Sequence, residues 1–202
     1  MSSQLDSYTL PPAVKRVANA FRLTGWVSFW AQAAMGIIST LVLFFSSLFI
    51  NTNRTIPNIP NVGSTVVRSN NPGLGFGLFL TSGGLIALYL GIFWAFRYVQ
   101  LSRRLKSSKT QSRPKRGDAF QILRNGLVIS IIGMFLTLLG AFSIVGALVG
   151  KSFQFGVTLG GLPSNFIEGA DIFTVQGALL VLFGHFLATV SSLWLLRTMN
   201  RQ

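Results

Sequence analysis

Three polar side chains inside long apolar stretches are the residues of this sequence that could do chemistry. His185 stands near the middle of one apolar run, with Gln176 earlier in the same run, and Gln32 lies in another. A neutral imidazole binds transition metals and serves as an axial ligand of haem. Three interpretations of His185 stay open: a hydrogen bond to Gln32 or Gln176, an axial ligand to chlorophyll or haem, and a position on a path for metal ions.

A pair of acidic residues precedes the last apolar run. Glu168 and Asp171 are three positions apart, and two carboxylates at the outer mouth of a pathway would collect cations. The alternative is structural, because Asp171 would cap the following helix and Glu168 would complement the positive end of its dipole. We assign no metal site on the basis of this pair.

The sequence contains no catalytic constellation. It has no cysteine and a single histidine, which removes disulfides, thiolate metal sites and iron–sulfur clusters. The histidine has no acid nearby in the sequence, and there is neither a phosphate-binding loop nor a zinc-protease motif. We therefore expect no enzyme and no cofactor, with iron or a tetrapyrrole at His185 as the exception that the sequence leaves open.

Charge-free apolar stretches define the fold class. Hydrophobic residues make up 50% of the 202 residues and charged residues only 10%, and the charges cluster between long apolar runs. A membrane-spanning helix needs about 20 apolar residues. The sequence therefore predicts an all-α polytopic membrane protein with about four transmembrane helices arranged as two hairpins. The spans predicted from the apolar runs are residues 23–50, 74–96, 125–150 and 172–196.

These spans divide the chain into five segments. They are 1–22 with a basic surface helix, 23–96 as the first transmembrane hairpin, 97–124 as a basic cytoplasmic connector, 125–196 as the second transmembrane hairpin and 197–202 as a cytoplasmic tail. In the first segment, Val14, Val17, Ala18 and Phe21 share one helical face. Such a face is typical of an amphipathic helix that lies in the membrane interface. Alternating apolar residues predict that the loop 151–171 also lies along the interface.

The basic residues predict the orientation of the chain. Most of the 17 Lys and Arg residues lie in the N-terminal segment, the connector and the tail, whereas Arg54, Arg68 and Lys151 lie in the other two loops. The positive-inside rule places the larger group, and both termini, on the cytoplasmic or stromal side. The residues expected to contact lipid headgroups are Lys15, Arg16, Arg22, Arg97, Arg103, Arg104, Lys106, Lys109, Arg113, Lys115, Arg116 and Arg124.

The net charge of +13 bears on the partners of the protein. Such a charge could indicate nucleic-acid binding, but the basic residues flank apolar runs and leave no room for a nucleic-acid-binding fold. Anionic lipid headgroups are the counter-charge that this placement favours. The expected partners are the bilayer and either another membrane protein or further copies of this chain, and no nucleic acid.

Small residues recur along one face of three spans. They are Gly83, Ala87, Gly91 and Ala95 in the second span, Gly126, Gly133 and Gly140 in the third, and Gly177 and Gly184 in the fourth. Small residues let helix backbones approach closely in lipid, which favours a tightly packed bundle. The alternative is that one of these faces meets the helix of a partner or a cofactor ring.

Several sequence blocks resemble a known family. They are FRLTGWVSFWAQ at 21–32, ALYLGIFWAFRYVQLSRRL at 87–105, ILRNGLVISIIGMFLTLLGA at 122–141 and HFLATVSSLWLL at 185–196. Together they are similar to the four-span family of cyanobacteria and chloroplasts known as the small inner-envelope Tic component, or "permease in chloroplasts". The resemblance implies a cyanobacterial plasma or thylakoid membrane, or the chloroplast inner envelope in plastid relatives. It implies no binding residues.

The resemblance implies two conflicting roles, an iron permease and a subunit of a protein-import machine. The four spans contain no Asp, Glu, Lys or Arg, although a desolvated cation needs ligands inside the membrane. This favours a non-enzymatic accessory or scaffold protein that assists membrane-protein insertion, import or the assembly of photosynthetic complexes. The alternative is an iron permease that acts as an oligomer.

Overall fold

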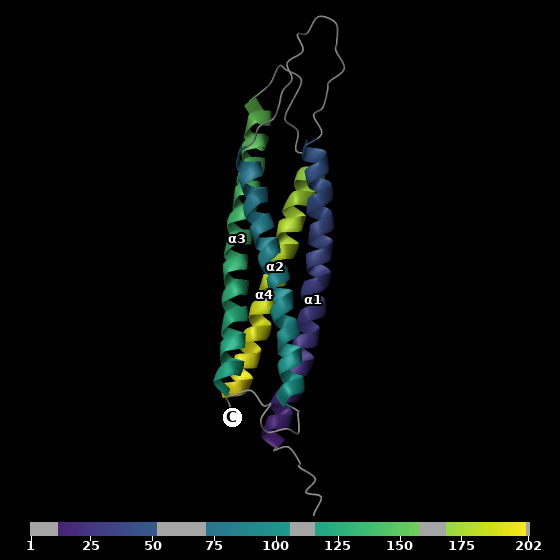
Figure 1. Cartoon of the computed structure of the whole chain (residues 1–202). Coiled ribbons are helices and arrows are strands. Elements are labelled where there is room, and N and C mark those ends of the chain that lie inside the picture. The colour runs from purple at the N-terminus through teal and green to yellow at the C-terminus, as the bar shows by residue number, and fades with distance from the viewer. Residues whose placement is uncertain (1–11, 52–71, 106–115, 158–168, 201–202) are drawn as a thin grey trace, which may run out of the picture. The chain divides into compact units, whose positions relative to one another are not determined.

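The computed structural model describes residues 12–51, 72–105, 116–157 and 169–200, all of which are helical. The helices are α1 (Pro12–Asn51), α2 (Pro72–Leu105), α3 (Arg116–Val157) and α4 (Gly169–Asn200) (Figure 1). Each contains an apolar stretch long enough to cross a bilayer. The prediction of an all-α membrane protein with four transmembrane helices is confirmed.

The first turns of the helices suit a helix N-terminus. Pro12 and Pro72 are the first residues of α1 and α2, where the missing backbone N–H of proline costs no hydrogen bond. Asp118 and Asp171 lie in the first turns of α3 and α4. Their negative charges face the positive end of each helix dipole. Arg197, in the last turn of α4, complements the opposite end of that helix.

The helices are longer than the apolar runs that predict the spans. α2 continues to Leu105, and α3 extends over 42 residues from Arg116 to Val157. Residues 151–157 are the last turns of α3, so the prediction that they belong to an interfacial loop is wrong. Hydropathy marks only the hydrocarbon layer, whereas a helix keeps its own hydrogen bonds after it leaves that layer.

The basic segment before the first span is the start of α1. From Pro12 onward it is helical and continuous with the span. Ala18 and Phe21, on its apolar face, are fully buried, while Arg16 and Arg22 are exposed. The segment has a basic and an apolar side, but its apolar side packs against the other helices and it continues directly into the span. The prediction of a helix that lies on the membrane surface is therefore not confirmed.

The helices form two compact units, and each unit takes one part of every helix. The described residues of unit 1 are 12–34, 87–105, 116–132 and 184–200, and those of unit 2 are 35–51, 72–86, 133–157 and 169–183. Unit 1 thus holds the N-terminal parts of α1 and α3 and the C-terminal parts of α2 and α4. Consecutive helices therefore run antiparallel within each unit. The division of the chain into two hairpins stays a prediction.

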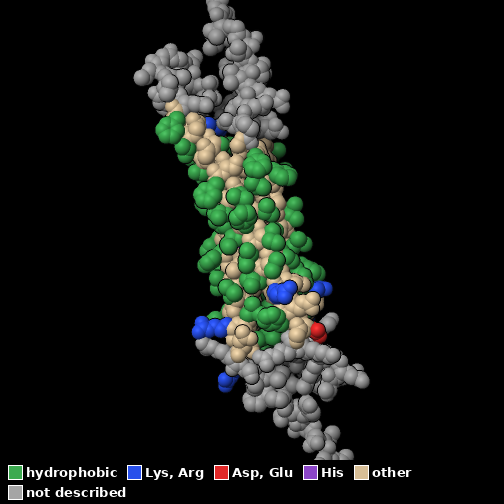
Figure 2. All heavy atoms as spheres, turned by 90° about the vertical axis from the view of Figure 1, so that its left-hand side faces the viewer, with side chains coloured by type: hydrophobic (Ala, Val, Ile, Leu, Met, Phe, Trp, Pro, Cys, Tyr) green, Lys and Arg blue, Asp and Glu red, His purple; other side chains and the backbone are tan. Residues whose placement is uncertain are grey.

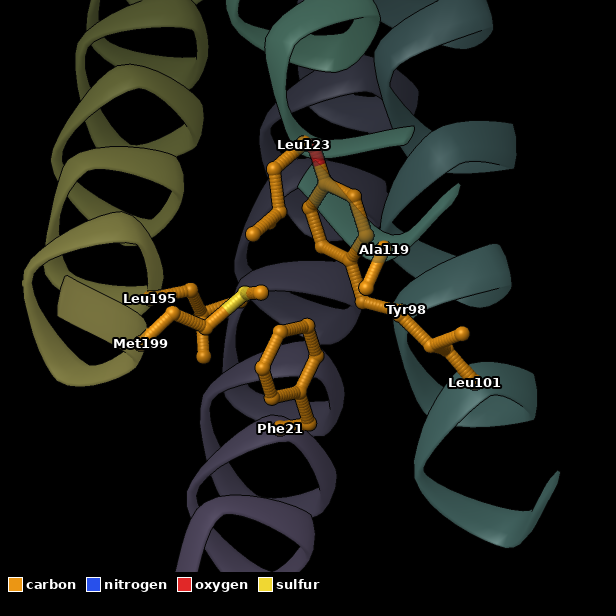
Figure 3. Packing of buried hydrophobic residues seen from close by; sticks show 7 residues of the cluster. All are labelled: Phe21, Tyr98, Leu101, Ala119, Leu123, Leu195 and Met199. Atoms are coloured by element: carbon orange, nitrogen blue, oxygen red, sulfur yellow. The ribbon is translucent and has the colours of Figure 1, made fainter. Parts of the chain in front are cut away.

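A hydrophobic cluster holds the helices of unit 1 together. It consists of Phe21, Tyr98, Leu101, Ala119, Leu123, Leu195 and Met199, which come from all four helices (Figure 3). Val17, Trp94, Ile122 and Leu196 pack around it and are partly buried. These contacts hold the four helix segments of unit 1 in place. The buried polar residues of this unit lie on the same segments.

In unit 2, α2 and α3 meet through glycine backbones. A Cβ atom on Gly77 would lie 2.9 Å from the carbonyl oxygen of Gly140, and one on Gly140 would lie 2.8 Å from the Gly77 oxygen. A Cβ atom on Gly84 would lie 3.2 Å from the carbonyl oxygen of Gly133. Side chains larger than hydrogen would push the helices apart, so glycine sets this helix spacing.

The outward face of the helices is apolar. Phe79, Phe135 and Phe142 are 74%, 60% and 67% exposed, and Figure 2 shows hydrophobic side chains over most of the visible helix surface. Only 28–33% of each apolar stretch is buried within the protein. Such a surface suits contact with lipid tails or with the helix of another membrane protein.

Candidate functional site

A buried polar layer in unit 1 contains Gln32, one of the candidates from the sequence. Its side chain is 1% exposed, and Nε2 donates a hydrogen bond of 2.6 Å to Ser28 Oγ. A Cβ atom on Gly91 would lie 3.0 Å from Gln32 Oε1 and 4.0 Å from Ser130 Oγ. The carboxamide therefore occupies space that Gly91 leaves open on α2, and Ser130 of α3 borders the same space. Within the described residues, Gln32 Oε1 accepts no hydrogen bond.

His185 is fully buried in α4 of the same unit, with an exposed fraction of 0%. It shares a helix face with Ala188 and Ser192, which are also buried. An axial ligand needs a ring nitrogen of the imidazole that points into a space wide enough for the flat macrocycle, and here protein atoms cover the whole side chain. A tetrapyrrole at His185 would therefore require the helices of unit 1 to separate.

Gln176 has a different environment from the other two candidates. It belongs to unit 2 and lies on the exposed face of α4, next to the exposed Ile172, Phe173 and Leu179. Of the two glutamines considered as partners of His185, only Gln32 is buried in the same unit as the histidine.

Tyr98 is a buried residue of unit 1 that was not among the predicted site residues. Its hydroxyl lies 3.2 Å from Ser192 Oγ on α4. The same hydroxyl touches Gly126 on α3, at a point where any Cβ atom would collide with it. The tyrosine therefore links three helices. An aromatic residue near an arginine-rich helix end suggests an interfacial anchor, and only the seven-residue interval from Gly91 indicates that Tyr98 points inward.

Buried serines also join helices. In unit 2, Ser46 of α1 donates a hydrogen bond of 2.8 Å to the carbonyl oxygen of Ala170 and is hydrogen-bonded to Thr174 Oγ1. In unit 1, Ser102 of α2 donates a hydrogen bond of 2.7 Å to the carbonyl oxygen of Ala18. Interhelical hydrogen bonds of this kind contribute about 0.6 kcal/mol each in membranes. They position helices and leave their hydroxyl groups occupied.

Asp171, a candidate for cation capture, forms an ion pair in unit 2. Lys151 Nζ lies 2.8 Å from its Oδ2 and 3.0 Å from its Oδ1, and the lysine and aspartate side chains are 13% and 3% exposed. The pair joins α3 to the first turn of α4 and balances the carboxylate within the protein. A cation bound by Asp171 would have to displace the Lys151 ammonium group. Glu168, the other candidate, lies outside the described residues.

The basic residues of the described helices gather in unit 1, and Lys151 is the one described basic residue of unit 2. Of the residues predicted to contact lipid headgroups, Arg16, Arg22, Arg97, Arg103 and Arg124 are exposed. Lys15, Arg104 and Arg116 lie in the helices, and Lys106, Lys109, Arg113 and Lys115 lie outside the described residues. Positive charge is therefore concentrated in the unit that contains the C-terminal end of α2 and the start of α3.

Most of the small residues predicted to pack between helices are buried. These are Gly91, Ala95, Gly126, Gly133, Gly140, Gly177 and Gly184. Gly83 has a looser environment, with Leu136 Cδ1 at 3.9 Å from the position of a Cβ atom, and Ala87 is partly exposed. Gly77 and Gly84, which were not predicted to pack between helices, are also buried. Their seven-residue spacing, continued by Gly91, is the signal that could have found them.

Hydrogen bonding within helices and between them is the chemistry that these buried groups support. Unit 1 contributes an amide, an imidazole and hydroxyl groups to its interior, and the described acidic residues are the exposed Asp118 and the paired Asp171. Within the described ranges, no three His, Cys, Asp or Glu side chains come together. A cation-binding set would need groups beyond these described side chains.

Comparisons with known proteins place the chain among relatives. The family described as "Protein of unknown function (DUF3611)" matches residues 11–200. A protein of Arabidopsis thaliana described as "Protein TIC 21, chloroplastic" is 29% identical over 210 residues, which cover 98% of this chain and 64% of the relative. The chain thus spans less than two thirds of that relative's length. No solved structure matches.

Proposed function

This chain belongs to the family described as "Protein of unknown function (DUF3611)", and on that premise we propose that it is a non-enzymatic accessory or scaffold protein of the membrane. It assists membrane-protein insertion, import or the assembly of photosynthetic complexes. The similarity to the chloroplastic protein TIC 21 confirms the resemblance found in the sequence blocks, and a role beside other membrane proteins follows from that resemblance as a proposal.

The observation that supports this proposal best is that buried polar groups bond to other groups of the same protein. Gln32 is hydrogen-bonded to Ser28, Tyr98 reaches Ser192, and Asp171 is paired with Lys151. The contacts of Tyr98 and Asp171 join helices, whereas that of Gln32 lies within α1; this use of the polar groups favours a structural role over a passage for ions. Recognition of another protein then falls to the outward face, where large apolar side chains can pack against a second helix.

An iron permease that acts as an oligomer is the second candidate. The observation that favours it is the full burial of His185 in the unit that also buries Gln32. Polar and ionisable residues inside a membrane are costly and often mark a functional site. Copies of this chain would have to bring several imidazoles together, because one histidine supplies one ligand.

Photo-crosslinking in the native membrane tests the scaffold role. A photoreactive amino acid would replace Phe135 or Phe142, which are exposed on α3, and in a matched control would replace Leu123, a large residue that is fully buried on the same helix. We expect the two exposed positions to crosslink to a discrete second membrane protein, and the buried position to give no product with another chain. Adducts would be identified by mass spectrometry.

Purification of the tagged protein in mild detergent provides the complementary measurement. The scaffold role predicts a partner at fixed stoichiometry. A bare homo-oligomer, together with crosslinks only between copies of this chain, would contradict the scaffold role and favour the permease.

A further inference from the structure

A small pocket opens between α2 and α3 within unit 1. It has a volume of about 180 Å³ and is lined by Arg97, Gln100 and Leu101 of α2 and by Ile122 of α3. Arg97 and Gln100 are exposed, whereas Leu101 is buried and Ile122 is partly buried. The pocket therefore combines two hydrogen-bond donors at its rim with an apolar floor.

The Arg97 guanidinium is held beside this pocket by two aromatic rings. Its Cζ atom lies 5.3 Å from the centroid of the Phe93 ring and 5.1 Å from that of Trp94, within the range of cation–π attraction. Among the described residues, no carboxylate forms an ion pair with Arg97. The guanidinium is thus oriented by its own helix and keeps its donors for an external anion.

The surroundings of the pocket indicate its depth in the membrane. All four tryptophans, Trp26, Trp30, Trp94 and Trp194, belong to unit 1, and indole rings favour the level of the lipid headgroups. Trp94 precedes Arg97 by one helical turn, and Arg103 follows where α2 becomes basic. We therefore expect the pocket to lie at the level of the lipid phosphate groups.

We propose that this pocket binds the phosphate group of an anionic phospholipid. Arginine donates two parallel hydrogen bonds to phosphate oxygens, and the Gln100 amide can donate a third. Leu101 and Ile122 then contact the glycerol and the first methylene groups of the lipid. The exposed Arg103 and Arg124 of the same unit repel the cationic end of a choline headgroup, which selects an anionic lipid. This site is independent of the scaffold role.

Lipid binding to the purified full-length protein tests the proposal. Short-chain phosphatidylglycerol and phosphatidylcholine would be titrated in detergent, and bound lipids would be counted by native mass spectrometry. We expect wild-type protein to hold phosphatidylglycerol in preference to phosphatidylcholine, and Arg97→Gln to weaken the binding of phosphatidylglycerol about tenfold. Arg197→Gln removes an exposed arginine of the same unit outside the pocket and should leave the affinity unchanged. If both variants lost affinity for phosphatidylglycerol equally, the effect would be one of general surface charge, and the proposed site would be wrong.

Further measurements distinguish a lipid phosphate from a free phosphate ion, and a specific loss of binding from misfolding of the variant. Inorganic phosphate at the same concentration should displace little lipid, because it lacks the glycerol and acyl groups; displacement as strong as that by phosphatidylglycerol would assign the pocket to a free anion and overturn the lipid. Arg97→Lys keeps the charge without the planar fork and should bind with intermediate affinity. Circular dichroism of each variant should show unchanged helix content, and retention of lipid by a folded Arg97→Gln protein would refute the proposal.

Discussion

The backbones of α2 and α3 touch at Gly77 and Gly140, where a methyl group on either residue would lie 2.8–2.9 Å from the carbonyl oxygen of the other. The contact is reciprocal, so neither helix can give way without moving the other. Because lipid tails are as apolar as the protein interior, an apolar side chain gains little free energy when it moves from lipid into a helix contact. Close approach of the backbones is therefore a main source of helix association.

Gly140→Ala should lower the stability of the protein. The added methyl group would collide with Gly77 and force α2 and α3 apart, and overpacking of this kind costs about 1–3 kcal/mol. Gly146→Ala is the matched control on the same helix, since nothing lies within 4 Å of its Cβ position; it should be neutral or slightly stabilising. Unfolding in mixed micelles with increasing denaturing detergent would compare the two variants. Equal midpoints would argue against the backbone contact.

Gly126→Ala should destabilise unit 1 in a way that Tyr98→Phe partly reverses. The new methyl group would meet the tyrosine hydroxyl directly, and removal of the hydroxyl relieves the collision. Tyr98→Phe alone loses only the hydrogen bond to Ser192, at a cost of about 0.6 kcal/mol. A double-mutant cycle of unfolding free energies would measure the coupling, and additive effects would contradict the predicted geometry.

Lys151→Met should destabilise the contact between α3 and α4 in unit 2. The change leaves the 3%-exposed Asp171 carboxylate without its counter-charge, and the loss of one partner of a buried ion pair costs about 3–5 kcal/mol. The double variant Lys151→Met, Asp171→Leu removes both charges and should recover most of the loss. Unfolding midpoints of the single and double variants decide the point, and a double variant as unstable as the single one would disprove a specific pair.

His185→Ala should leave assembly intact. If the protein is a scaffold, the variant loses the packing of one fully buried side chain, and it still copurifies with its partner. We expect the pure wild-type protein to be colourless and to take up no iron in proteoliposomes. Gln176→Ala, at an exposed position, is the control for substitution of a polar residue in the same helix. If the wild-type protein and Gln176→Ala took up iron and His185→Ala did not, the result would support the permease.

Both termini and the connector 97–124 should face the cytoplasm or stroma. The chain has no cysteine, so single cysteines introduced by Ser112→Cys in the connector and Ser152→Cys in unit 2 report their sides without background. A membrane-impermeant maleimide should label Ser152→Cys in intact cells and Ser112→Cys only after the membrane is opened. The reverse pattern would invert the positive-inside assignment.

The direction in which each helix buries its residues is what the sequence predicts least well. In a soluble protein apolar residues mark the inside, but here both the interior and the lipid accept them. Phe79 is mostly exposed and Leu88 fully buried on the same helix, although both are large and apolar. The four-residue series Gly83, Ala87, Gly91 and Ala95 is prominent in the sequence, yet the closest approach to α3 in unit 2 uses Gly77 and Gly84.

Helix number and type were predictable because long apolar runs leave no other structure that satisfies the backbone in lipid. Pairings between distant residues were not. The ion pair of Lys151 with Asp171 depends on α3 continuing to Val157, beyond the end of its apolar run, so a lysine assigned to a loop became the partner of a buried carboxylate. Gln32 was identified as a polar residue at depth, but its place beside Gly91 required the register of two helices.

The hydrogen bonds of Ser46 imply an order in time during synthesis of the chain. The serine bonds to Ala170, 124 positions later, and to Thr174, 128 positions later. At a translation rate of about 5–20 residues per second, α1 exists for on the order of ten seconds before these partners are made. During that interval the contact of Leu43 with Gly177 cannot form either, and this face of the first helix meets lipid or an insertion factor. A nascent chain arrested before α4 would therefore expose this face of α1 to the insertion machinery. Such an arrested chain could be used to capture that machinery.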